Sequence, residues 1–200
     1  MVVLTLAIMF IRLVYRLLAH RPVLRTFISM ACLAVLYFAA VLVAGVLTSE
    51  SLVAPGTVKC FDDWCVTVTH AAEYSSLSGV SPLGRFIVVD VKVLAESRRV
   101  VQKGSDPHVY LIDAKGHKYE PSPAAQASLE KSAGTQLPLT NPVGPGDSFI
   151  TRQAFDIPKD SGNLRVLVTE QPWITKIVLF NENSFLSGRT LFVIDPKPES

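Results

Sequence analysis

Two cysteines with four residues between them are the side chains of this sequence whose type and spacing most readily suggest chemistry. Cys60 and Cys65 could hold a metal ion, but a metal site needs further cysteine or histidine ligands at suitable spacing, and the histidines that follow are isolated from one another. A redox motif usually has two residues between its cysteines. An oxidising compartment instead permits a structural disulfide. We therefore predict a disulfide between Cys60 and Cys65 that fixes a turn.

The residues inside this turn have two interpretations. An exposed tryptophan in a loop held by a disulfide would be a good anchor for a protein partner. Alternatively, the two aromatic side chains cover the edge of the folded domain, which is the interpretation that we favour. If the turn does contact a partner, the candidate residues are Phe61, Asp62, Asp63 and Trp64.

Other polar side chains give little support for catalysis. Asp106, His108, Asp113 and His117 lie around one predicted hairpin and could form a metal site or an acid–base pair. Alternating strand positions point to different faces, however, and polar residues are ordinary in loops. The sequence contains no G-x-S-x-G motif, no phosphate-binding glycine loop and no nucleotide-binding motif. We therefore predict no catalytic residue, no metal site and no cofactor, and a protein that is not an enzyme.

An uncharged run of 22 residues, Phe27 to Thr48, precedes all of these side chains. As a helix it reaches about 33 Å, enough to cross a hydrocarbon core of about 30 Å. The apolar region of a cleaved signal peptide is shorter, about 7–15 residues. We predict a transmembrane helix over residues 27–48. Cleavage after a signal peptide is the alternative, because residues 43–45 (Val-Ala-Gly) make a passable cleavage site.

Basic residues set the direction of this predicted span. Residues 1–48 contain no acidic residue and four arginines, Arg12, Arg16, Arg21 and Arg25. Loops rich in arginine stay in the cytoplasm, which places the chain from about residue 49 in the periplasm or outside the cell. Residues 1–26 are predicted to form a basic cytoplasmic or interfacial segment that contacts membrane lipid, and a short first span within residues 1–19 is the alternative.

The remaining 152 residues carry 15 basic and 17 acidic side chains, so they are nearly neutral. This charge gives no support for a nucleic-acid partner, which requires a basic stripe on the folded domain.

Short extended runs alternate with turn residues from Val58 onward. The strongest run is 86–95, where odd-numbered Ile87, Val89, Val91 and Val93 are expected to face the core. A turn is predicted over 113–116. The one long connection is 121–145, which either contains a short helix over 124–131 or is a surface loop of unusual length. Many short strands separated by glycine and proline indicate an all-β sandwich. We predict seven to nine strands over residues 58–195, between a linker (49–57) and a tail (196–200), with these strands: 65–70, 86–95, 108–113, 117–120, 148–155, 164–169, 176–180 and 189–194.

A series of motifs between Gly84 and Asp195 resembles a known family. The series consists of the valine-rich strand 85–93, a D-x-x-G-x-x-Y hairpin starting at Asp113, a P-G turn at 145–146 and an F-D-x-P strand end at 155–158. Together these motifs resemble a widespread bacterial family of uncharacterised extracytoplasmic immunoglobulin-like domains, which includes a secreted mycobacterial immunoprotective antigen. The resemblance implies an immunoglobulin-like antiparallel sandwich that follows a signal peptide, a lipobox or a single membrane span. It implies no activity and no catalytic residues.

These observations together predict a membrane-anchored, extracytoplasmic, immunoglobulin-like interaction module that binds an envelope or extracellular protein. The alternative is a small-ligand or metal-sensing accessory domain of an envelope transporter or sensor system. That alternative requires a pocket into which several polar groups converge.

Overall fold

The computed structural model describes Thr5, Ile8 and Tyr15 together with residues 10–12, 24–47, 50–61, 64–170 and 189–199. Helix α2 belongs to one compact unit of the chain, and all the described strands belong to a second unit. The predicted strand at 176–180 lies outside the described residues. Two of the predicted orientation arginines, Arg16 and Arg21, and the two aspartates of the cysteine turn, Asp62 and Asp63, lie outside them as well.

Helix α2 (Leu24–Leu47) confirms the prediction of a long apolar helix and extends it by three residues at its start. Its length and composition are sufficient to cross a membrane, and a signal sequence near the N-terminus has the same properties. Among the described side chains of α2, only Val41 is buried.

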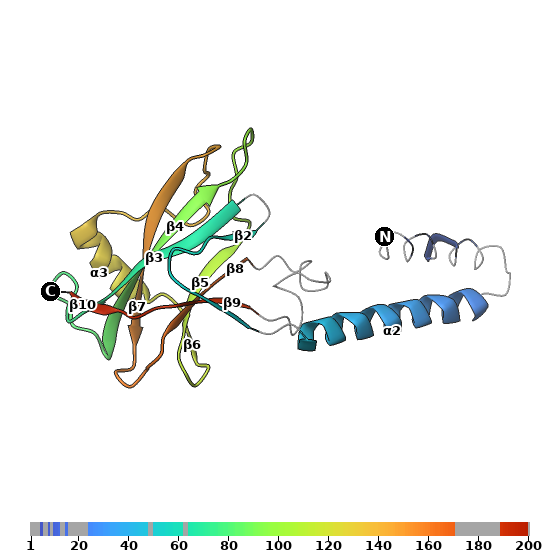
Figure 1. The fold of residues 1–200 in the computed structure, drawn as a ribbon, viewed down its shortest axis with the longest axis horizontal. Coiled ribbons are helices and arrows are strands. Elements are labelled where there is room, and N and C mark those ends of the chain that lie inside the picture. The colour runs from blue at the N-terminus through green and yellow to red at the C-terminus, as the bar shows by residue number, and fades with distance from the viewer. Residues whose placement is uncertain are drawn as a thin grey trace. The chain divides into compact units, whose positions relative to one another are not determined.

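The second unit contains two sheets of five strands each (Figure 1). All neighbouring strands are antiparallel except β1 with β9 and β10 with β3. The first sheet has the order β1 (Ser51–Val53), β9 (Thr190–Val193), β8 (Arg165–Glu170), β5 (Pro107–Ile112) and β6 (Lys118–Tyr119). The second has the order β10 (Lys197–Glu199), β3 (Trp64–Tyr74), β4 (Arg85–Ala95) and β7 (Ser148–Ile157), with β2 (Lys59–Phe61) also paired to β3.

The main core lies between these two sheets. The four odd-numbered side chains of β4 that were predicted to face inward are all fully buried in it. They share one cluster with side chains from the other sheet, among them Val109, Val168 and Phe192. Because β-branched side chains pack well on a pleated surface, this valine-rich strand is well suited to the centre of its sheet. The predicted two-layer β-sandwich is therefore confirmed, whereas the immunoglobulin-like class remains a prediction.

Helix α3 (Pro123–Ala133) covers part of the outer face of the second sheet (Figure 1). The hydroxyl of Ser122 accepts a hydrogen bond from the first turn of the helix. Pro123 follows at the start of the helix, where a backbone N–H would have no partner within the helix. On the buried side of the helix, Leu129 packs in one cluster with Phe86 and Val88 of β4. The predicted helix over 124–131 is confirmed, and β4 is buried on both faces where the helix lies.

Two glutamine side chains satisfy backbone groups of β7, which lies at the edge of its sheet. The amide of Gln126 donates to the carbonyl oxygen of Arg152 and accepts from the N–H of Ala154, both at 3.0 Å. The amide oxygen of Gln136 accepts from the N–H of Arg152 at 3.1 Å. An open edge can pair with another chain, so these side chains occupy positions that a foreign strand would otherwise use.

Two segments that were expected to lie outside the sheets contribute strands to them. Part of the predicted linker forms β1, and part of the predicted tail forms β10. The carboxylate of Glu199 in β10 accepts a hydrogen bond from the hydroxyl of Tyr74 at 2.5 Å. The same carboxylate lies 3.0 Å from a ring nitrogen of His70. Backbone pairing and these side chains hold β10 in place, although its sequence has no apolar pattern. The assignments of residues 49–57 as a linker and 196–200 as a tail are therefore corrected, because each segment contains a strand.

Candidate functional site

The predicted cysteine pair lies in a hairpin. Cys60 and Cys65 face each other across β2 and β3, and their sulfur atoms are 2.01 Å apart, the distance of a disulfide bond. Among the described residues, one cluster of cysteine, histidine or acidic side chains is compact enough to hold a metal ion. It consists of the two cysteines and Glu96. Metal ligation requires thiolates, and a disulfide has none. This cluster is therefore a covalent clamp on a hairpin.

Trp64 is not the exposed anchor that one interpretation of this turn requires. Only 2% of its surface is exposed, and its ring belongs to the main core. Phe61 is half-buried, with its ring centre 5.4 Å from that of Trp64. Trp64, Val66 and Val68 are alternate residues of β3 and therefore point to the same face of the sheet. That face packs into the core. Burial of Trp64 argues against the possible surface contact and agrees with the interpretation favoured from the sequence, in which the two aromatic side chains cover the domain.

The four polar residues of the β5–β6 region form two separate pairs. Asp106 lies 3.1 Å from His108 on the surface, and Asp113 lies 3.0 Å from His117 across the predicted turn. The four therefore do not converge on one metal or acid–base site. Asp113 is the buried member, and it organises the hairpin.

The carboxylate of Asp113 accepts four hydrogen bonds. The backbone N–H groups of Lys115 and His117 donate at 2.8 and 2.9 Å, and the hydroxyl of Tyr119 and the ring of His117 each lie at 3.0 Å. Burial acts to raise the pKa of Asp113, but hydrogen bonds from His117, Tyr119 and Lys115 outweigh it and lower the pKa to about 2. The carboxylate therefore stays charged at neutral pH and holds a turn.

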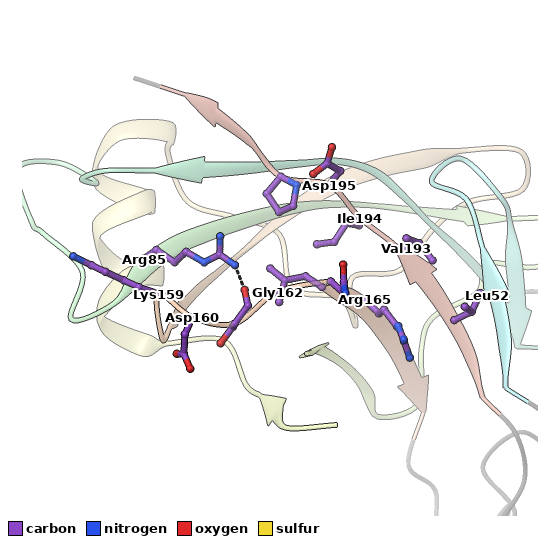
Figure 2. A pocket seen from close by; sticks show the side chains of 13 residues that line it. Leu52, Arg85, Lys159, Asp160, Gly162, Arg165, Val193, Ile194 and Asp195 are labelled. Carbon is purple, nitrogen blue, oxygen red and sulfur yellow. Dashed lines mark hydrogen bonds between the residues drawn. The ribbon is translucent and has the colours of Figure 1, made fainter. Parts of the chain in front are cut away.

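A chain of hydrogen bonds continues from this hairpin to the other sheet. The hydroxyl of Tyr119 lies 3.2 Å from the hydroxyl of the buried Ser161. The backbone carbonyl oxygen of Ser161 accepts a hydrogen bond from the guanidinium of Arg85, drawn as the dashed line in Figure 2. Arg85 also donates to the carboxylate of Glu73 at 2.8 Å. This chain joins β3 and β4 of one sheet to the hairpin of the other at one end of the sandwich.

A pocket of about 680 Å³ lies beside this chain of hydrogen bonds and includes Arg85 in its lining (Figure 2). Three cationic side chains, Arg85, Lys159 and Arg165, and two carboxylates, Asp160 and Asp195, line it together with apolar side chains. Its size is within the range of small-ligand sites. Sequence analysis missed this pocket because its walls come from β4, the β7–β8 turn and the end of β9, which no local pattern brings together.

A second polar cluster lies on the outer face of the other sheet, in the described residues. The guanidinium of Arg152 lies 3.3 Å from the carboxylate of Asp90. Burial raises the pKa of Asp90, although Arg152 acts to lower it. The hydrogen bond to Glu199 is the main cause that raises the pKa of Tyr74 to about 12. This cluster fastens β10 to the sheet.

The fold and these side chains define a class: a two-layer β-sandwich that follows a long apolar helix. Comparison with protein-family models found no match, and comparison with curated proteins found none either. Solved structures do show similarity. A conserved hypothetical protein of Bacillus anthracis is 21% identical, with a TM-score of 0.48 over 57% of this chain and 88% of that chain.

Two other solved structures are similar over more of this chain. MPT63, a secreted protein of Mycobacterium tuberculosis, is 12% identical, with a TM-score of 0.46 over 72% of this chain and 98% of that one. An uncharacterized β-sandwich protein of Clostridium difficile is 11% identical, with a TM-score of 0.43 over 74% of this chain and 96% of that one. The assignment of a sandwich rests on the two sheets and the core between them.

Proposed function

We propose that this protein is a membrane-anchored module that presents its β-sandwich outside the cytoplasm to an envelope or extracellular protein, and that it catalyses no reaction. The observation that supports the anchor is the surface of α2. Single exposed apolar side chains are ordinary, but a contiguous apolar surface is typical of contact with a membrane or a partner. Seven large apolar side chains of α2 are between 48% and 67% exposed: Phe27, Ile28, Val35, Leu36, Phe38, Leu42 and Val43.

The direction of the anchor follows from charge. Arg12 and Arg25 precede the apolar part of the helix, together with two further arginines in the sequence, and no acidic residue lies before Glu50. The positive-inside rule then assigns the N-terminus to the cytoplasm and the sandwich to the other side. The disulfide between Cys60 and Cys65 supports the same assignment, because such bonds persist in oxidising compartments.

Two measurements on the full chain test the anchor and its direction. We expect the protein to resist extraction from membranes at alkaline pH and to keep its full mass of 21.8 kDa. A shorter mature chain that starts near residue 45 would show a cleaved signal peptide instead. A reporter fused after the C-terminus should be active only if it functions outside the cytoplasm, and activity of a cytoplasmic reporter at that position would contradict the topology.

The partner is tested by crosslinking in native membranes. We expect crosslinks from the exposed loops of the sandwich to a specific envelope protein, with unchanged recovery after Trp64→Phe, because Trp64 is buried. A chain that crosslinks to no protein from any loop would contradict the role of an interaction module.

A second candidate function, binding of a small ligand, is favoured by the pocket beside Arg85. Three cations and two carboxylates in one pocket suit a ligand that carries opposite charges or several hydroxyl groups. A thermal-shift screen of the full chain in detergent tests this candidate. A stabilising ligand should lose its effect in Arg165→Gln and keep it in Lys131→Gln, which lies on helix α3 outside the pocket. Equal shifts in both variants would contradict binding at this pocket.

A further inference from the structure

We propose that the loop between β4 and β5 (residues 96–106) rests on anionic lipid headgroups and binds them through Arg98, Arg99 and Lys103. The proposal rests on the membrane anchor proposed above. It assigns a ligand, the phosphate groups of the bilayer surface, to one end of the sandwich.

The register of the first sheet identifies the end of the sandwich at which the chain enters. Three residues lie between Leu47, the end of α2, and Ser51, the start of β1, so the four steps from one Cα atom to the next span at most about 14 Å. Ser51 is paired with Thr190 at the start of β9. Antiparallel pairing of β9 with β8 and of β8 with β5 places the end of β8 and the start of β5 at this same end. The loop that leads into β5 at Pro107 therefore emerges there.

This loop is held in shape by its own hydrogen bonds. The hydroxyl of Ser97 accepts from the N–H of Val100 at 3.0 Å and donates to its carbonyl oxygen at 2.7 Å. Gln102 pairs with Val143 through two backbone hydrogen bonds. At the base of the loop, the N–H of Ser105 donates to the carboxylate of Glu170 at 2.7 Å. These hydrogen bonds fix the backbone of the loop.

Charge and exposure of the tip suit a lipid surface. Residues 97–103 contain three cations and no acid, and Arg98, Arg99 and Lys103 are all exposed. None of the three forms an ion pair within the residues that the structure describes. Between them, Val100 and Val101 are 60% and 58% exposed. Exposed apolar side chains flanked by cations are the composition of segments that enter the headgroup region.

Among the residues that the structure describes, four acidic side chains lie near the ends of this loop. Asp147 is exposed, and its backbone pairs with Ala95 just before the loop. Asp106 lies 3.1 Å from His108, and Glu170 accepts the hydrogen bond from Ser105. Glu96, at the base of the loop, is exposed. Each arginine or lysine close to an anionic surface strengthens binding about five-fold, so three together contribute on the order of 100-fold. A lipid surface is favoured over a protein as the occupant because the short tether keeps this end of the sandwich near the bilayer.

Fluorescence of a labelled loop tests the proposal in the full chain. Val101→Cys in a Cys32→Ser background gives one free thiol for an environment-sensitive dye, because the other two cysteines form the disulfide. The protein is placed in nanodiscs of phosphatidylcholine with or without phosphatidylglycerol. We expect a blue shift, and quenching by headgroup-labelled lipid, only when phosphatidylglycerol is present. In about 1 M salt the Debye length is about 3 Å, and the signal should disappear.

Two triple variants with equal loss of charge provide the comparison. Arg98→Gln, Arg99→Gln and Lys103→Gln together should abolish the quenching. The matched control removes three exposed cations that lie outside the loop: Lys115→Gln, Lys131→Gln and Lys197→Gln. Loss of the signal in both variants, or equal quenching in neutral and anionic nanodiscs, would overturn the proposal.

The result also separates this proposal from the anchor on which it rests. A chain that does not enter nanodiscs shows that the anchor itself is wrong. A chain that enters them and gives no quenching overturns the lipid contact alone. Crosslinking of residue 101 to a protein in native membranes, with no quenching by anionic lipid, overturns it in favour of a protein occupant.

Discussion

Two arginines in the middle of α2 should prevent the protein from staying in the membrane. Val35 and Leu36 are each 67% exposed and lie at the midpoint of a helix of 24 residues, so about 18 Å of helix separates them from either end. That distance is too great for an arginine side chain to reach the headgroups. The variant Val35→Arg/Leu36→Arg therefore places two charges in the hydrocarbon core.

The magnitude follows from the composition of the helix. Residues 27–44 contain nine phenylalanine, isoleucine, leucine or valine residues, which together favour insertion by roughly 3–5 kcal/mol. The variant keeps seven of them and adds two central arginines at about 2.5–3.5 kcal/mol each, so insertion becomes unfavourable by roughly 1–5 kcal/mol. The sign of the insertion free energy changes.

Alkaline extraction of membranes measures this change. We expect the wild-type chain in the membrane pellet and the Val35→Arg/Leu36→Arg chain in the soluble or degraded fraction. The control Leu24→Arg/Leu47→Arg adds the same two charges at the ends of the helix, where arginine reaches the headgroups, and it should stay in the pellet. Equal retention of both variants would refute the anchor, because a helix that spans the bilayer cannot hold two arginines at its centre as readily as at its ends.

Three further predictions concern the sandwich. Gly84→Ala should lower the melting temperature by several degrees, because an added Cβ would lie 2.0 Å from a backbone oxygen of β7 and overpacking destabilises by about 1–3 kcal/mol; Gly162→Ala, with open space around it, should melt no lower than wild type, and equal melting of both would contradict this reasoning. The pKa of Asp113 is lowered from 3.8 to about 2 in the folded state, so its stabilisation is present above pH 4 and is lost as the pH falls toward 2. Urea midpoints of Asp113→Asn should therefore lie below those of wild type at pH 6 and approach them near pH 2, and a constant difference would contradict the hydrogen-bonded carboxylate. Gln126→Ala should speed hydrogen exchange of the Ala154 amide by about 2- to 10-fold, the value of one hydrogen bond, and unchanged exchange would show that the edge does not need this side chain.

Local sequence patterns predict the strands, helices and turns that depend little on distant parts of the chain. The odd-numbered apolar residues from Ile87 to Val93 indicate a strand with one face in the core, and residues 124–131 offer a stretch that could form a helix. The structure confirms both elements. Asp113 was likewise expected to open a turn, and it does so by accepting hydrogen bonds from the backbone two and four residues further on.

Elements that form only by pairing with distant segments could not be predicted from the sequence. Lys197-Pro198-Glu199 has no apolar pattern, and it becomes a strand because β3 offers a free edge and Tyr74 donates to Glu199. The pocket beside Arg85 needs several segments, Leu52 of β1 among them, that meet only in the folded chain. Trp64 was ambiguous because exposure of an aromatic side chain near a turn depends on which face of its strand is buried.

The two parallel pairings at the ends of the domain have a consequence for biogenesis. β1 at residues 51–53 needs β9 at 190–193, and β3 at 64–74 receives β10 at 197–199, so the first strands to cross the membrane pair with the last. Contacts of such sequence separation form slowly, because a long loop must close before they can stabilise the fold. If the anchor is as proposed, these two pairings cannot form until residues 190–199 have been translocated. β3, β4 and β7 can pair earlier, so the edges to which β9 and β10 are added stay open until late in translocation.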